Sequence, residues 1–424
     1  MAQQHLDPTD PMAGAMTGDA LAGYLRAQAT EFLRALRLHR ETGGDGGAPA
    51  RSKSRAAGNG SGESVDAARA LRRSARRISA SLHTFRPLLD PDWSETIRPE
   101  LAWLSGTLAM EHAYAARLER LLLALHRLSG APVFPAQAGI ALTTGASTAD
   151  AAADGDSAST ACAATPAGGA GTQSAAHTDS PSGTASDTSD AAAGGRATGA
   201  APGGTGPASR PAPTAERGNL TVGAAKAGAL LERQLTLART RAHSTALQAL
   251  GSSRFHAVAD TIALLASEVP LTPAAATADL RPLAAAAEER LTDAVAALPL
   301  VTAGHPYNAA ALIHGLSPDP APHPQDAPWH QVRLLLRLHR YAREVLHGDD
   351  TQVDVRLLAT GQALDRHRDA SEAAAAAAQA ARTPRIAPAT AYALGVLHAD
   401  QRHEVEAARF AFQQSWQPQT VGTP

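Results

Sequence analysis

Residues 68–88 read ARALRRSARRISASLHTFRPL, and this stretch decides the fold. On a helix of about 100° per residue, five arginines fall within roughly 140° of one another and five apolar residues lie opposite, within roughly 80°. The pattern predicts an amphipathic helix with one face for burial and one cationic face. The cationic face, hereafter the first basic face, consists of Arg69, Arg72, Arg73, Arg76 and Arg77, and the apolar face of Leu71, Ala75, Ile78, Leu82 and Phe85.

A second basic helix is expected in WHQVRLLLRLHRYAREVL, residues 329–346. Its cations span an arc of roughly 80° and form the second basic face: His330, Arg333, Arg337 and Arg340. Like charges spaced i, i+4 on a helix repel by about a few tenths of a kcal/mol per pair. Each basic face is therefore either a solvated surface or a surface that an anion neutralises, and the pattern alone leaves both interpretations open.

The overall composition narrows the class of protein. The 424 residues carry 38 Lys+Arg against 40 Asp+Glu, a formal net charge of -2, so an anion site requires local segregation of charge. Only Lys53 and Lys226 are lysines, and arginine can grip phosphate oxygens in a bidentate way. Cys162 is the one cysteine, which excludes a disulfide framework or a cysteine metal site within the chain. Aromatic residues at 4% argue against an all-β domain and against single-strand binding by base stacking.

The start of the chain, MAQQHLDPTDPMAG, lacks the basic and apolar regions of a signal peptide. No uninterrupted apolar run approaches the roughly 18 residues that a membrane span needs. We therefore expect a soluble cytoplasmic protein that makes no use of a membrane.

Segment composition predicts the domain organisation. We expect a disordered leader at 1–17 and the first part of a helical bundle at 18–130, with a flexible Gly-rich linker at 43–63. Residues 131–217 are almost wholly Ala, Gly, Ser, Thr, Pro and Asp, which predicts a disordered insertion. The remaining helices and a second bundle are expected at 218–415, followed by a tail at 416–424.

Helical periodicity dominates the expected ordered parts, and no segment shows a convincing strand pattern, so we predict an all-α fold built from helix bundles. Ser94 is the expected N-cap of a long helix that Pro99 would kink or restart, and Thr272-Pro273 the expected start of a helix ending near 298. The other expected helices are 19–43, 64–89, 219–250, 254–268, a short one near 308–314, 327–347, 352–382 and 388–414.

Two features indicate an internal duplication. Each basic helix is followed later in the chain by a segment of similar sequence. These segments are WLSGTLAMEH at 103–112 and YALGVLHADQ at 392–401. In the order ARALRRSARRISASLHTFRPLLD, ELAWLSGTL, RFHAVADTIALLASEVPLTPAA and WHQVRLLLRLHRYAREVL, the chain resembles the CHAD (conserved histidine α-helical) domain family. The resemblance covers about 18–130 and 219–414 and identifies the chain as a divergent, stand-alone member.

The resemblance implies two pseudo-symmetric four-helix bundles with basic residues between them, and binding of inorganic polyphosphate. The implied polyphosphate-binding residues are Arg69, Arg72, Arg73, Arg76, Arg77, His330, Arg333, Arg337 and Arg340. Arg69 stands where the family's first motif opens with histidine, and Leu338 where a further arginine is usual. Residues 281–295 carry only Arg281 and Arg290, so the basic surface is thinner than in relatives.

Three functions stay open. The first is non-enzymatic polyphosphate binding, and the second is a helical scaffold that has lost this ligand and binds a protein partner. The third, nucleic-acid binding, is disfavoured by the charge balance. No paired carboxylates, Walker loop, GxSxG or CxxC motif supports catalysis, and we expect neither a metal site nor a cofactor. Asp365 with Arg366 is interpreted as solvated helix charge, and the four tryptophans as packing anchors.

Overall fold

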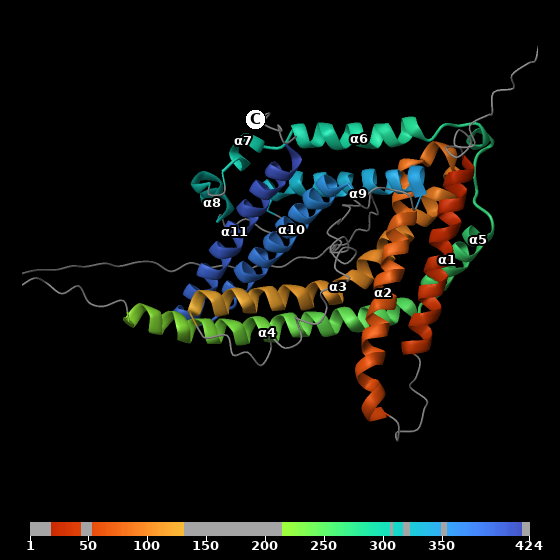
Figure 1. The fold of residues 1–424 in the computed structure, drawn as a ribbon. Helices are drawn as coiled ribbons and strands as arrows, with labels where there is room; N and C mark the ends of the chain where they lie inside the picture. The colour runs from red at the N-terminus through yellow and green to blue at the C-terminus, as the bar shows by residue number, and fades with distance from the viewer. Residues whose placement is uncertain are drawn as a thin grey trace, which may run out of the picture. The chain divides into compact units, whose positions relative to one another are not determined.

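The computed structural model describes residues 18–43, 53–130, 214–305, 308–316, 323–348 and 354–417. The helices of these segments fall in one compact unit, apart from the first two residues of one helix (Figure 1). They are α1 (Gly18–Gly43), α2 (Lys53–Thr84), α3 (Pro91–Ser129), α4 (Thr214–Leu250), α5 (Ser253–Ser267), α6 (Arg281–Ala296), α7 (Leu300–Ala303), α8 (Ala309–Gly315), α9 (Ala327–His347), α10 (Val355–Ala381) and α11 (Pro388–Trp416).

The all-α prediction is confirmed for the described residues. They contain no strand, only an isolated antiparallel bridge between Leu89 and Leu271. The second basic helix has the bounds that the sequence predicts, and α11 begins at the expected Pro388. None of the helices described here is long and apolar enough to cross a membrane.

Two predicted helix boundaries are wrong. The structure starts α2 at Lys53, inside the segment 43–63 that composition assigned to a flexible linker. Once a strong amphipathic helix has nucleated, each further residue adds a backbone hydrogen bond, so the helix can extend backwards through weak formers. In the same way α4 begins at Thr214, within the predicted insertion 131–217. The leader 1–17, residues 131–213 and the tail from 418 lie outside the described residues.

The predicted helix starts at Ser94 and Thr272 are also wrong. Asp90 is the N-cap of α3, since its Oδ1 accepts a hydrogen bond from the backbone nitrogen of Trp93 at 2.8 Å. Pro99 lies inside α3 without ending it. Thr272-Pro273 opens only the short 3-10 helix Pro273–Ala276, and α6 starts later, at Arg281.

Three clusters of buried side chains hold the helices together. The first cluster packs α1, α2, α5 and the start of α3, with Phe32, Phe85 and Phe255 at its centre. The second packs the end of α6, the start of α10 and the end of α11 around Trp329 of α9. The third packs the second half of α3, α4 and the facing parts of α10 and α11.

Helix α9 links two of these clusters. Its first part supplies Trp329, Val332 and Tyr341 to the second cluster, whereas Ala342 and Val345 belong to the first. Helix α2 packs against α9 (Figure 1). The two basic helices, which lie about 250 residues apart in the sequence, are therefore neighbours in the fold.

Candidate anion-binding site

The apolar face of α2 is buried as the sequence predicts. Leu71, Ala75, Ile78, Leu82 and Phe85 are all fully buried in the first cluster. Their burial against α1, α3 and α5 fixes the rotation of α2, because turning the helix would expose all five. The same rotation places Arg77 against α9 and Arg72 in a pocket that it shares with α10.

The first basic face is not simply a solvated surface. Arg72 and Arg76 are only 3% and 8% exposed, and Arg73 is half-buried. Charged side chains are rarely buried to this extent without compensating partners. Of the two interpretations that the sequence left open, a surface that simply faces water is therefore excluded for Arg72 and Arg76.

The two ends of this face carry carboxylate partners. Arg69 pairs with Asp66 on its own helix at 3.2 Å, in an exposed position. Arg77 Nε donates to Glu344 Oε2 of α9 at 2.9 Å, and the hydroxyl of Tyr24 on α1 donates to the same oxygen at 3.0 Å. Burial alone would lower the pKa of Arg77, but Glu344 outweighs it and raises that pKa. Glu344 therefore joins three helices, and Arg77 has a role in packing.

The second basic face also contains a residue that is ion-paired within the fold. Arg333 is 8% exposed, and its Nε donates to Asp365 Oδ1 of α10 at 2.6 Å. The interpretation of Asp365 as a solvated charge is therefore wrong, because α9 brings a buried arginine against it. His330 is half-buried, and its ring makes an edge-to-face contact with His367 at 5.5 Å between centroids. Arg337 and Arg340 are half-buried.

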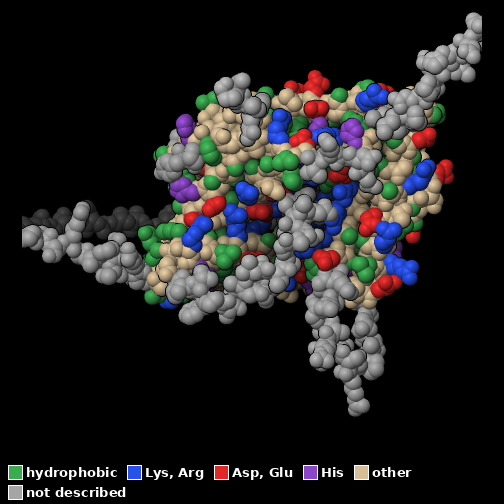
Figure 2. All heavy atoms as spheres, viewed as in Figure 1, with side chains coloured by type: hydrophobic (Ala, Val, Ile, Leu, Met, Phe, Trp, Pro, Cys, Tyr) green, Lys and Arg blue, Asp and Glu red, His purple; other side chains and the backbone are tan. Residues whose placement is uncertain are grey.

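Cations from several helices converge on one pocket of about 590 Å³. Helices α2, α3, α10 and α11 contribute its walls. Its basic lining consists of Arg72, Arg117, Arg120, Arg127 and Arg368, and its acidic lining of Glu119, Asp369, Glu372 and Glu404. Figure 2 shows Lys and Arg side chains gathered near the middle of the side of the molecule in view, over the region between α2, α3, α9 and α10 in Figure 1.

Arg368 of α10 connects the two basic faces. Burial lowers the pKa of His112 on α3, and Arg69, Arg72 and Arg368 lower it further. Burial likewise lowers the pKa of His330; Asp326 opposes this shift, while Arg333 and Arg368 reinforce it. Both histidines are therefore neutral at pH 7, and Arg368 lies within electrostatic reach of residues from both basic faces. Arg368 was missing from the sequence-based site.

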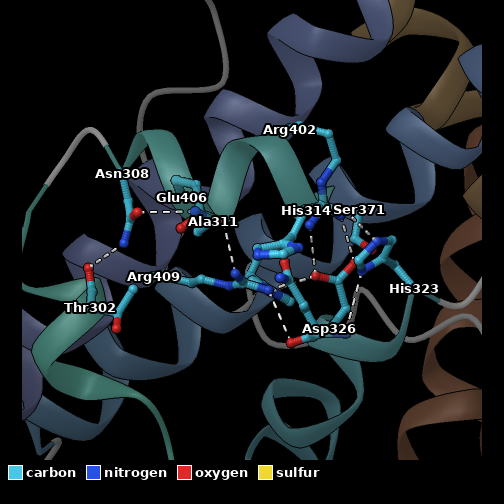
Figure 3. A network of polar contacts seen from close by, with 12 residues as sticks. Thr302, Asn308, Ala311, His314, His323, Asp326, Ser371, Arg402, Glu406 and Arg409 are labelled. Carbon is cyan, nitrogen blue, oxygen red and sulfur yellow. Dashed lines mark hydrogen bonds and ion pairs between the residues drawn. The ribbon is translucent and has the colours of Figure 1, made fainter. Parts of the chain in front are cut away.

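Next to the second basic face lies a buried ionic network centred on Asp326, just before α9 (Figure 3). Asp326 is fully buried. Arg402 Nη1 and Arg409 Nη2 of α11 donate to its two carboxylate oxygens, each at 2.7 Å, and the hydroxyl of Ser371 on α10 also donates to it. Glu406 accepts from Arg409 at 2.7 Å. Two guanidinium groups thus balance two carboxylates inside the fold.

His367 of α10 connects this network to the second basic face. Its Nε2 lies 3.6 Å from Asp326 Oδ1, and its ring stacks on Trp329 and contacts His330. Burial lowers the pKa of His367 to about 4 despite the opposing effect of Asp326. Burial by itself would raise the pKa of Asp326, but His367 and Arg402 hold it well below its usual range. Trp329 is confirmed as a packing anchor by its burial in the second cluster.

Sequence reasoning missed this network because its members look like ordinary helix charges. Arg402, Glu406 and Arg409 follow one another at spacings of four and three, which places them on one face of α11. That spacing is the one available signal, and it does not reveal the distant Asp326. Within the described ranges, no group of three His, Cys, Asp or Glu side chains could hold a metal ion.

With this geometry in place, comparisons with known proteins define the class. The model of the CHAD domain family matches residues 50–174 and 208–378, well over half of the chain. This protein therefore belongs to the CHAD domain family. The family match ends before α11, which supplies Arg402 and Arg409 to the buried network.

A solved structure is similar over nearly the whole chain. PptA from Streptomyces chartreusis is 60% identical, and the similarity covers 95% of this chain and 99% of PptA, with a TM-score of 0.63. No curated protein matches the chain. The similarity to PptA extends the relationship beyond the family match, to the helices of all three buried clusters.

Proposed function

We propose that this protein binds inorganic polyphosphate without converting it, along the first basic face and the adjacent pocket. The observation that carries the proposal is the convergence of Arg72, Arg117 and Arg368, from three different helices, on one pocket, where Arg117 and Arg368 also pair with the carboxylates of Glu372 and Asp369. Membership of a family whose resemblance implies this ligand supports it. The cytoplasmic location and the lack of a cofactor, both expected from the sequence, belong to the same proposal.

The chemistry of the ligand fits a row of arginines better than one deep pocket. Polyphosphate carries a negative charge on each phosphate, so it is held by many spaced cations. Guanidinium groups at i, i+3 and i+4, as in Arg69, Arg72, Arg73 and Arg76, can each grip phosphate oxygens with two N–H donors. A linear anion would lie along α2 and reach Arg368 on α10.

The predicted binding residues are expected to contribute unequally. Arg77 is held between Tyr341 and Glu344, so a phosphate would compete with an existing ion pair. Arg333 has the same relation to Asp365. We therefore expect these ion pairs to reduce the contributions of Arg77 and Arg333, and expect His330 to act as a neutral hydrogen-bonding group.

The finer architecture is part of this proposal: two four-helix bundles related by a pseudo-twofold axis, with the ligand surface between them. Two observations support this architecture: the two basic faces lie on neighbouring helices, and α3 and α11 contain segments of similar sequence. Superposition of the two halves in an experimental structure would test the axis directly.

A second candidate function is a scaffold that has lost the ligand and binds a protein partner. The ion pairs of Arg77 with Glu344 and of Arg333 with Asp365 favour it, because they neutralise part of both basic faces from within the fold. Nucleic-acid binding by the same surface is the third candidate. Direct competition between polyphosphate and duplex DNA at matched salt separates it from the first.

The deciding experiment is a titration of the full chain with long-chain polyphosphate at low salt. We expect Arg72→Ala, Arg73→Ala and Arg76→Ala together to weaken binding by about a hundredfold or more, since charge-assisted contacts are the strongest of their kind. Arg34→Ala with Arg37→Ala is the matched control, because those arginines are exposed on α1 and paired only with their own helix.

Arg72 and Arg76 are buried, so the triple variant requires a folding check by circular dichroism. The single variant Arg73→Glu, at a half-buried position, reverses a charge with less disturbance of packing and should still weaken binding. If wild-type protein shows no polyphosphate binding at low salt, the proposal is wrong and the scaffold function becomes the better account.

A further inference from the structure

The pocket lined by Arg72, Arg117 and Arg368 holds a carboxylate of the protein itself between its cations. Arg117 of α3 donates a hydrogen bond to Glu372 Oε2 of α10, and Arg368 Nε lies 3.7 Å from Glu372 Oε1. Glu372 lines the same pocket as the two arginines. It therefore lies between cations from two helices, in the place where the proposed ligand would bind.

A second carboxylate on α10 assists Glu372. Asp369 Oδ1 accepts a hydrogen bond from Arg368 Nε at 3.1 Å, but its side chain is 45% exposed against 22% for Glu372. Because water screens an exposed ion pair, we expect Glu372 to hold its arginines more strongly than Asp369 does. Arg117 also lies over the ring of Tyr114, 5.4 Å from its centroid, which keeps this guanidinium at the pocket independently of Glu372.

The charge of Glu372 extends to the second basic face. Burial lowers the pKa of His330 on α9, and Asp326 and Glu372 counteract this shift. Glu372 is thus within electrostatic reach of α9 as well as of the pocket. A carboxylate in this position lowers the positive potential that an approaching anion experiences at both.

A carboxylate and a phosphate compete for the same donors. Each offers acceptor oxygens to the fork of a guanidinium group, so a phosphate that binds Arg117 and Arg368 has to displace Glu372. Glu372 is tethered to α10, and its effective concentration at the two arginines is therefore high. A short anion confined to the pocket exchanges one ion pair for another, whereas a long chain gains further contacts along α2.

We propose that Glu372, assisted by Asp369, occupies the place of a phosphate in the ligand-free protein and thereby makes the site favour long polyanions over short ones. Specificity of this kind arises from a built-in competitor that penalises the weaker ligand. The inference rests on the proposed function, since it concerns the selectivity of the same site.

The test is titration of the full-chain variant Glu372→Gln, which loses the charge but keeps the size of the side chain. At low salt we expect tripolyphosphate to bind at least about tenfold more tightly than to wild type, because no carboxylate competes for Arg117 and Arg368. Long-chain polyphosphate should gain less, about threefold, since it can also bind along α2 without displacing Glu372.

Glu100→Gln is the matched control. Glu100 of α3 pairs with Arg254 of α5, its side chain is 29% exposed, and it does not line the pocket. The substitution changes the net charge of the protein by the same amount at another interhelical pair. It should give a much smaller gain in affinity for tripolyphosphate than Glu372→Gln gives.

Thermal melts separate competition from a structural role. Glu372→Gln leaves two largely buried guanidinium groups less compensated, so it should melt at a lower temperature than wild type without ligand. A purely structural carboxylate would give this loss without any gain in affinity. Should the variant fail to fold, Asp369→Asn tests the same competition at Arg368 from a more exposed position and should tighten tripolyphosphate binding several-fold.

The outcomes distinguish this inference from the proposed function. If wild type binds long-chain polyphosphate but neither variant binds tripolyphosphate more tightly than wild type, the inference is wrong and the proposed function stands. If the variants bind polyphosphate and wild type does not, the inference holds and the proposed function is wrong. If none of these proteins binds either anion, both are wrong.

Discussion

At the scale of single residues, Asp326 is the centre of the buried ionic network. Its carboxylate is fully buried yet ionised, because Arg402, Arg409 and Ser371 all donate to it. Desolvation of so many charges consumes most of the attraction between them. Such a network contributes little net stability when complete, but removal of one member leaves the others buried and uncompensated.

Asp326→Asn should therefore destabilise the fold strongly. Loss of its negative charge leaves two buried guanidinium groups facing a neutral amide, and we expect a loss of about 3–5 kcal/mol in the free energy of unfolding. Urea denaturation at pH 7 measures it. Glu31→Gln removes a carboxylate from the exposed pair with Arg34 on α1 and should change stability by less than about 1 kcal/mol. Equal effects of the two substitutions would contradict the role of Asp326.

The pKa of His367 predicts a dependence of stability on pH. This pKa lies at about 4 in the fold against an ordinary value of 6.5, so between these limits the unfolded chain binds a proton that the folded protein does not. The free energy of unfolding should therefore fall as the pH decreases from about 6.5 to 4, by roughly 3 kcal/mol for this group. Above pH 6.5 this contribution is fully present.

Denaturation of wild type and His367→Gln over that pH range tests the prediction. The variant should be less stable at pH 7, but its stability should fall less steeply toward pH 4. His256→Gln, at an exposed position of α5, serves as the control for loss of a histidine. If His367→Gln and wild type lose stability in parallel, His367 is not the group that titrates.

At the scale of helices, small residues allow the closest packing. Ala373, Ala374 and Ala377 of α10 are buried, so the helix can approach α11 closely. The buried members of the alanine run at 373–378 are thus part of the core. Their short side chains produce only a weak hydrophobic pattern in the sequence. Gly223 plays the same role where α4 meets the start of α11, because a Cβ built there would lie 2.2 Å from the backbone oxygen of Ala389.

Gly223→Ala should separate α4 from α11. A contact of that length requires the backbone of one helix to move, and we expect a loss of about 1–3 kcal/mol in the free energy of unfolding. Gly395→Ala is the matched control, since this exposed helical glycine has no atom within 4 Å of the added Cβ. It should stabilise the protein by up to about 1 kcal/mol, because alanine favours the helix. Thermal melts of both variants measure the difference, and a neutral Gly223→Ala would disprove the close approach.

Helix bounds were predictable where the chain carries strong local signals. Asp326 and Pro328 mark the start of α9, and Gly348, with a φ of 58°, marks its end. The start of α2 carries no such stop signal, and the continuation of the helix to Lys53 depends on propagation from the amphipathic part. Composition alone therefore misplaced that boundary.

At the scale of the whole molecule, a net charge of -2 coexists with two basic faces. The fold achieves this by placing arginines from α2, α9 and α10 near one another, while many acidic side chains pair elsewhere. Arg37 with Glu41 and Arg254 with Glu100 are examples of such outer ion pairs. Packing thus gathers arginines from distant parts of the chain, but four acidic side chains line the same pocket.

Salt dependence tests this arrangement. Binding of a polyanion releases condensed counterions, so the logarithm of affinity should fall linearly with the logarithm of salt concentration. Polyphosphate titrations at several salt concentrations should give a slope for Arg72→Ala with Arg73→Ala that is smaller than the wild-type slope by roughly one per arginine removed. The control Arg34→Ala with Arg37→Ala should keep the wild-type slope. Equal slopes in all three proteins would show that the first basic face makes no contact with the ligand.

The sequence by itself determined the all-α class, the family and both basic helices. These follow from local periodicity, and a helix of 3.6 residues per turn converts spacing into faces without knowledge of any partner. Only the tertiary structure decided which carboxylates the arginines pair with and which arginines line one pocket. Glu344 and Arg77, or Asp326 and Arg409, lie far apart in the sequence, and helix packing alone brings them within 3 Å of each other.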